Sequence, residues 1–190
     1  ACLLGGVFVF ASLSAQAEVF INEIHYDDAE TPTAGDQNEA VEIVATNGED
    51  LSLYDIVLYN GGSNGSAATT YDTDAVPVGA IVACSSNVRI GVVNYTSPAQ
   101  LQNGSFDGIA LVRRSDNAVI QFLSYEGAAT ASNGPASGMT SINIPVSEAG
   151  STLEGTSLQL TGTGAGYANF TWAASATSTF GTCNNNQVFN

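Results

Sequence analysis

Short apolar runs alternate with turn-forming residues along the chain from residue 18 onward. The runs are rich in β-branched and aromatic residues, which favour pleated strands. We expect strands at 19–26, 41–44, 56–59, 80–84, 90–93, 157–160 and 170–172. No stretch in this region keeps a sustained 3.6-residue apolar period, so helices are expected to be short or absent.

The clearest hairpin signal lies near the middle of the chain. Two runs of period 2, 108–114 and 118–125, flank the turn formers Ser115-Asp116-Asn117. Several short strands separated by turns are typical of an antiparallel β-sandwich, so the predicted fold class is all-β. No internal repeat and no break in composition divides residues 18–190, which we expect to form one domain.

Residues 1–17 have a different character. The apolar run 3–13 is shorter than the roughly 20 residues that a membrane-spanning helix needs. Ala15 and Ala17 follow it in the A-x-A pattern of signal-peptidase cleavage. We therefore expect a signal peptide over residues 1–17, clipped at its start, and a secreted or periplasmic mature chain that begins at Glu18 and has no membrane anchor. The alternative, a lipid on Cys2, would put the apolar run after the anchor, which is the wrong order.

Export would place the other two cysteines in an oxidising compartment, where they can pair. Cys84 ends an expected strand and Cys183 lies near the C-terminus. A Cys84–Cys183 disulfide would hold that terminus against the domain. The alternative is two unpaired thiols, one of them a small core residue.

Charge removes several classes of function. The chain has 18 Asp and Glu against 3 Lys and Arg, a formal net charge of −15, and its basic residues are all arginine. Without lysine, P-loop nucleotide binding, Ser-Lys dyads and Schiff-base chemistry are excluded. The single histidine, His25, excludes a site built from several imidazoles. The large negative charge opposes binding to a phosphate backbone, so we expect no direct nucleic-acid binding.

Acidic residues are concentrated between residues 18 and 55, ahead of the first basic residue, Arg89. If the first two strands pair, Glu23 and Glu42 approach each other, with further carboxylates in the connecting loop. Like charges held close need a cation, a proton or solvent to relieve their repulsion. Ca²⁺ is the hard cation expected outside the cell. The candidate ligands are Glu23, Asp27, Asp28, Asp36, Glu39 and Glu42. The alternative is a solvated acidic face that keeps the protein soluble.

Alternation along the strands predicts which side chains share a face. One face of the first strand is expected to carry Val19, Ile21, Glu23 and His25. The other is expected to carry Phe20, Asn22, Ile24 and Tyr26. In the second strand, Val41 and Ile43 share a face and Glu42 takes the opposite one.

Catalytic arrangements find little support in the residues. A Ser-His-Asp triad would have to use His25, and no G-x-S-x-G elbow presents a serine, so we interpret His25 as an ordinary strand residue. Clustered carboxylates leave a glycosidase or a two-metal phosphoesterase open. However, Trp172 is interpreted as core, and the acidic half has no cation to hold a phosphate. We assign no catalytic residue and no organic cofactor.

Several segments in order carry a family resemblance. They are Val19-Phe20-Ile21-Asn22-Glu23-Ile24-His25-Tyr26-Asp27, Glu39-Ala40-Val41-Glu42-Ile43, 51–61, 107–112, 121–127, 157–162 and 170–173. In this series the chain resembles bacterial secreted lamin-tail domains over nearly all of 18–190. The resemblance implies an immunoglobulin-like β-sandwich that is exported and accompanies secreted nucleases or phosphatases as a non-catalytic module. Two departures are Ala40, where an aromatic is usual, and Leu53-Tyr54, where Gly-Trp is usual.

These expectations favour a secreted, non-catalytic binding module, stabilised by calcium, that interacts with an extracellular protein or with itself. One alternative is a self-assembling subunit of an extracellular fibre or surface layer, because its Thr-, Ser- and Asn-rich loops can pack between copies. A second alternative is a metal-dependent secreted hydrolase that acts on phosphoesters.

Overall fold

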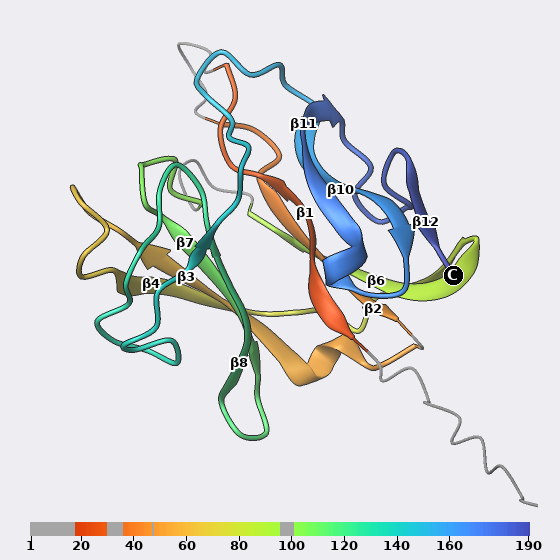
Figure 1. Cartoon of the computed structure of the whole chain (residues 1–190), viewed down its shortest axis with the longest axis horizontal. Helices are drawn as coiled ribbons and strands as arrows, with labels where there is room; N and C mark the ends of the chain where they lie inside the picture. Colours follow the sequence, from red (N-terminus) through yellow and green to blue (C-terminus); the bar gives the residue numbers. More distant parts are fainter. Residues whose placement is uncertain (1–17, 30–35, 47, 96–100) are drawn as a thin grey trace, which may run out of the picture.

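The computed structural model describes residues 18–29, 36–46, 48–95 and 101–190. In these ranges the chain forms two β-sheets that face each other, the five-stranded one on the left and the seven-stranded one on the right of Figure 1. The only helical turns in the described part of the chain are two 3-10 turns, η1 (Leu51–Leu53) and η2 (Tyr167–Asn169). The prediction of an all-β, two-sheet fold is therefore confirmed. The expected signal peptide, residues 1–17, lies outside the described residues.

The larger sheet has the order β11-β10-β1-β2-β6-β5, and β12 pairs with β10 in parallel. Its strands are β1 (Val19–His25), β2 (Ala40–Thr46), β5 (Ala80–Cys84), β6 (Ser86–Asn94), β10 (Thr156–Gly164), β11 (Phe170–Thr177) and β12 (Gln187–Phe189).

The smaller sheet has the order β4-β3-β7-β8-β9. Its strands are β3 (Tyr54–Asn60), β4 (Thr69–Ala75), β7 (Gly108–Arg113), β8 (Ala118–Ser124) and β9 (Ile142–Asn143). The expected hairpin at 108–125 is β7 and β8. It turns through Asn117, whose positive φ of 57° suits an asparagine.

Strand alternation builds the core of the smaller sheet. Ile56 and Leu58 of β3 join the main core between the sheets, while Val57 and Tyr59 face a second apolar cluster on the outside. The segment after β8 covers this outer cluster with three small buried side chains, Ala129, Ala131 and Ala136. Both faces of the central strands β3 and β7 are thus largely removed from water.

The first strand does not alternate as predicted, because it contains a β-bulge. The pairing with β2 runs Ile21 opposite Ile43 and then Glu23 opposite Glu42, so Asn22 is the additional residue. Side chains directly opposite each other project to the same face. Ile21 and Glu23 therefore lie on opposite faces, and the predicted grouping of Val19, Ile21, Glu23 and His25 on one face is wrong. The bulge puts the polar Glu23 on the side away from the smaller sheet.

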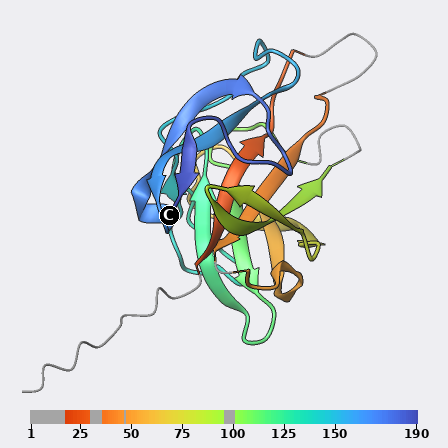
Figure 2. The same ribbon diagram turned by 90° about the vertical axis from the view of Figure 1, so that its right-hand side faces the viewer.

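The outer face of the larger sheet is also covered. Every residue of β1 and β2 is buried, including the polar Glu23, His25 and Glu42 on the outward side. Figure 2 faces this side and shows the C-terminal segment in dark blue, toward the viewer from β1 in red. A disulfide between Cys84 and Cys183, with Cα atoms 5.5 Å apart, joins this segment to the end of β5.

Candidate functional site

Two fully buried carboxylates, Glu23 and Glu42, lie opposite each other on β1 and β2. Oε1 of Glu23 accepts hydrogen bonds from Ser157 Oγ at 2.5 Å and from the Thr179 backbone N–H at 2.7 Å. Its Oε2 accepts from Thr179 Oγ1 at 2.9 Å. Burial raises the pKa of Glu23, against the effect of these donors.

The second carboxylate of the pair is held by donors from two segments. Oε1 of Glu42 accepts from Asn22 Nδ2 at 2.8 Å, and Oε2 accepts from the Gly181 backbone N–H at 2.7 Å. Burial, and then the negative charge of Glu23, raise the pKa of Glu42 to about 8. The two glutamates therefore bind the C-terminal segment through hydrogen bonds, and each has both oxygens occupied.

Amide side chains complete this buried network. Asn184 Nδ2 donates to the backbone oxygens of Asn22 at 2.9 Å and Leu160 at 3.2 Å. Gln187 Nε2 donates to Asn22 Oδ1 at 2.7 Å. We call the covering segment 178–190 the C-terminal clamp. Its donors and the disulfide hold it on the outer face of the larger sheet.

The histidine lies at the end of β1, buried and bonded on both sides. His25 Nδ1 is 3.0 Å from Glu148 Oε1, and Nε2 is 3.0 Å from the backbone oxygen of Gln37 and 3.6 Å from Asp28 Oδ2. Because both ring nitrogens face acceptors, the ring is an imidazolium. Burial lowers the pKa of His25, but the hydrogen bond and charge of Glu148 outweigh it and raise the pKa to about 8.

Glu148 also binds the backbone directly after the first strand. Its Oε2 accepts from the backbone N–H groups of Tyr26 at 2.6 Å and Asp27 at 3.2 Å. Sequence reasoning did not identify this residue, because nothing local marks a loop glutamate as the partner of a strand 122 residues away. His25 is the strand residue that the sequence predicted, and its environment is structural.

Of the remaining predicted ligands, Asp27 and Asp36 lie near Asn103, and Glu39 lies elsewhere. Burial, and then the charge of Asp36, raise the pKa of Asp27 to about 6, with the Asn103 amide acting in the opposite direction. Asp36 accepts from the Asp28 backbone N–H at 3.1 Å and from Asn103 Nδ2 at 3.3 Å. Glu39 lies apart from them and accepts from the Leu101 backbone N–H at 3.5 Å.

The six predicted ligands therefore do not surround one point. They separate into four places. Glu23 and Glu42 form the pair on β1 and β2, and Asp28 faces His25. Asp27 and Asp36 lie near Asn103, and Glu39 lies at Leu101. Within the described ranges, no three His, Cys, Asp or Glu side chains converge as a metal-binding group.

The two arginines of the β7–β8 turn are paired with acids. Arg113 binds Asp116 through two hydrogen bonds of 3.0 and 2.7 Å, and Arg114 Nη2 is 2.6 Å from Asp55 Oδ1. Both guanidinium groups are therefore bound by carboxylates of this chain, which compete with any anion for them.

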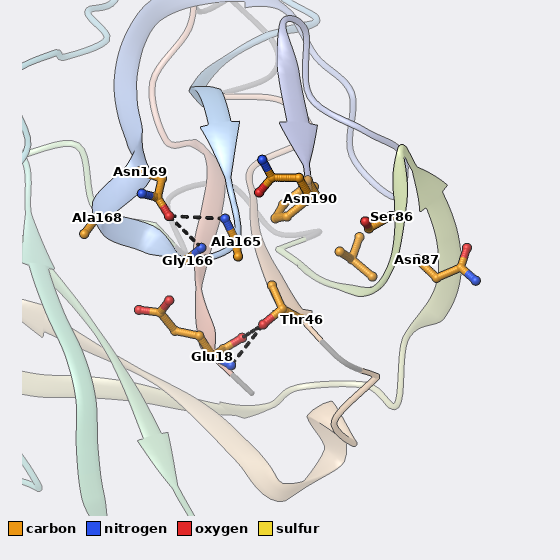
Figure 3. A pocket seen from close by; sticks show the side chains of 11 residues that line it. Glu18, Thr46, Ser86, Asn87, Ala165, Gly166, Ala168, Asn169 and Asn190 are labelled. Carbon is orange, nitrogen blue, oxygen red and sulfur yellow. Dashed lines mark hydrogen bonds between the residues drawn. The ribbon is translucent and has the colours of Figure 1, made fainter. Parts of the chain in front are cut away.

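A hollow of about 470 Å³ opens where β1 begins and β12 ends (Figure 3). Its wall mixes amide and hydroxyl side chains with a larger share of apolar surface, to which Phe189 and Val88 contribute. Glu18 is its only charged residue, and Oε2 of Glu18 accepts from the Tyr167 backbone N–H at 3.1 Å. Figure 3 shows Asn87 and Asn190 on the side of the hollow opposite Ala168.

Strand β5 forms one edge of the larger sheet, next to β6, which contributes Ser86, Asn87 and Val88 to the hollow. Residues 76–88 contain no charged side chain, although the net charge of the chain is −15. Val78 and Ile81 are each 52% exposed. An uncharged, apolar edge strand offers unpaired backbone groups to a strand of another chain.

Among the described residues, no helix is long and apolar enough to cross a membrane. Comparison of the chain with family models, curated proteins and solved structures finds no match. The resemblance to lamin-tail domains therefore stays a prediction from the residues.

Proposed function

We propose that this chain is an exported, non-catalytic β-sandwich module that binds a protein partner outside the cell through the edge strand β5. The observation that carries the proposal is the uncharged stretch 76–88, which places Val78 and Ile81 in solvent at a sheet edge. Elsewhere the large negative charge repels an acidic partner, whereas β5 itself carries no charged side chain. Its cross-strand neighbour Arg89, opposite Ile81, hydrogen-bonds the backbone oxygens of Gly48 and Gly79.

Three further observations support the rest of the proposal. The Cys84–Cys183 disulfide suits an oxidising compartment. The imidazole and the paired glutamates, which are the groups best suited to chemistry, are buried and bind side chains and backbone of the protein itself. The resemblance to bacterial secreted lamin-tail domains implies an immunoglobulin-like module that accompanies a secreted nuclease or phosphatase.

The test is affinity capture from the culture supernatant of the producing organism, with the oxidised protein as bait. We expect one exported protein to bind at a fixed stoichiometry. Ile81→Lys puts a charge into the edge and should raise the Kd of the isolated pair at least about tenfold, or about 1.4 kcal/mol. Leu153→Lys is the control, because Leu153 is a 74% exposed loop residue far along the chain. Equal loss in both variants would refute β5 as the binding edge.

The same edge favours a second candidate, a self-assembling subunit, because β5 can pair with β5 of another copy. Light scattering of the purified protein decides between them. Assembly that grows with concentration and is abolished by Ile81→Lys would support the subunit. A hydrolase would instead release phosphate or nucleotides from phosphoesters, and Glu42→Gln would abolish that release.

A further inference from the structure

Two aspartates and an amide meet at the end of β1, outside the buried pair and the C-terminal clamp. The Asp27 carboxyl group is a hydrogen-bonding neighbour of both Asp36 and Asn103. The Asn103 amide also reaches Asp36 Oδ2, at 3.3 Å. Asp36 is fixed from the other side by the Asp28 backbone N–H, at 3.1 Å from Oδ1. Two aspartates nine positions apart thus lie beside an amide that is 67 residues further along the chain than Asp36.

The Asp27 carboxyl group has one oxygen without a partner. Asp27 is only 6% exposed, and its Oδ1 is buried without a hydrogen bond. A carboxylate oxygen removed from water without a donor or a cation is costly, and such an atom in a native fold calls for an explanation. The neighbouring imidazolium does not supply one, because both of its nitrogens already face Glu148 and the Gln37 carbonyl.

The contact between two carboxylates adds to the need for a cation at this place. Asp27 and Asp36 repel each other when both are ionised, and Glu126 adds negative charge nearby. No Arg lies here in the described part of the chain, since Arg113 and Arg114 pair with acids at the β7–β8 turn and Arg89 binds the backbone oxygens of Gly48 and Gly79. A bound cation would satisfy the orphaned oxygen and relieve the repulsion together.

We infer that Asp27, Asp36 and Asn103 form a binding site for one calcium ion. Ca²⁺ accepts carboxylate, amide and backbone oxygens in irregular arrangements, whereas Mg²⁺ demands near-octahedral geometry and keeps its waters. A flip of the Asn103 side-chain amide exchanges Nδ2 for Oδ1 and presents this oxygen to the ion, since the two orientations of the amide are nearly equivalent in shape. Only two acids are involved, which agrees with the absence of any three-acid group in the described ranges.

This site replaces the six-carboxylate set that the sequence suggested with a smaller one. Glu23 and Glu42 have all four oxygens bonded to donors, so a cation there would have to displace the C-terminal clamp. The inference is independent of the partner-binding edge, since β5 contributes no residue to the site.

The test is thermal unfolding and calorimetric titration of the EDTA-treated, oxidised protein. With a Kd near 10⁻⁴ M, typical of extracellular calcium modules, 10 mM CaCl₂ should raise the Tm by about 5 to 10 °C. Calorimetry should give one ion per chain. MgCl₂ at the same concentration, and NaCl at the same ionic strength, should raise the Tm by no more than about 2 °C through screening.

Variants separate this site from the acidic surface in general. Asp27→Asn with Asp36→Asn should abolish the calcium-specific rise, and Asn103→Ala should weaken binding about tenfold. The matched control is Glu154→Gln, which removes one negative charge at an exposed loop position and should bind calcium as the wild type does. Equal stabilisation by the three salts, or the same titration for the double variant and the control, would overturn the site. If the double variant does not fold, the wild-type stoichiometry and the Asn103→Ala titration decide.

Discussion

The paired glutamates should make the protein less stable as the pH rises. Glu42 is fully buried, and Glu23 is the charged group that faces it; the C-terminal clamp contributes only uncharged donors. A carboxyl group whose pKa is raised in the folded state keeps its proton there, while the unfolded chain releases it. Glu42→Gln removes the titrating group but keeps its size, so this substitution isolates its contribution.

The pKa difference sets the size and the pH window of the effect. The pKa of Glu42 is about 8 in the folded protein, against 4.5 for the free side chain. Between these values the unfolded state binds fewer protons than the folded state, so the free energy of unfolding falls as pH rises. The full stabilisation is present below about pH 4.5, and about 5 kcal/mol is lost by about pH 8.

Urea unfolding in EDTA from pH 5 to pH 9 measures this dependence. The wild type should lose several kcal/mol over the range, while Glu42→Gln should show a shallower slope. The variant also loses one hydrogen bond at the clamp, which costs about 1 to 3 kcal/mol at every pH. The slope, and not the intercept, is therefore the relevant quantity. Glu154→Gln should follow the wild-type slope. Parallel curves for the wild type and Glu42→Gln would refute the reasoning.

Three other substitutions test how the fold is held together. Replacing Cys84 and Cys183 with serine opens a loop of sequence separation 99 and should cost about 3 to 5 kcal/mol in urea unfolding; a loss under about 1 kcal/mol would contradict this. Glu148→Ala removes the carboxylate that binds the buried imidazolium and the backbone N–H groups of Tyr26 and Asp27 just beyond β1, so we expect a loss of about 3 to 5 kcal/mol, measured by thermal unfolding. Gly79→Ala adds a methyl group 2.4 Å from a backbone oxygen of β6 at a φ of +78° and should cost about 2 to 4 kcal/mol. Gly155→Ala, at a φ of +76° with open space around it, should cost only about 1 to 2 kcal/mol, and equal losses would show that the contact is irrelevant.

Most strands could be predicted because their signal is local. β5 was expected at 80–84 and is observed at Ala80–Cys84, and the β7–β8 hairpin was expected from its turn residues. The strands that were missed lack such a signal. β4 (Thr69–Ala75) is mostly polar, and β12 (Gln187–Phe189) has only three residues and depends on its pairing with β10.

The candidate site was predictable only in part. The approach of Glu23 to Glu42 follows from the pairing of two recognisable strands, and it is observed. Their role does not follow, because the donors come from Thr179 and Gly181, more than 130 residues away. The same holds for Asp27 and Asn103, which no pattern in the chain connects.

The sequence alone determined the all-β class, the positions of most strands and the excess of negative charge, because alternation, turn residues and composition are properties of neighbouring residues. Only the tertiary structure decided which carboxylates are satisfied by donors, which face an imidazolium, and which retain an oxygen without a partner. That distinction depends on what the folded chain places over the outer face of a sheet. Hydrogen bonding and burial between distant segments are set by the whole fold, and they separate a structural carboxylate from one that can bind an ion.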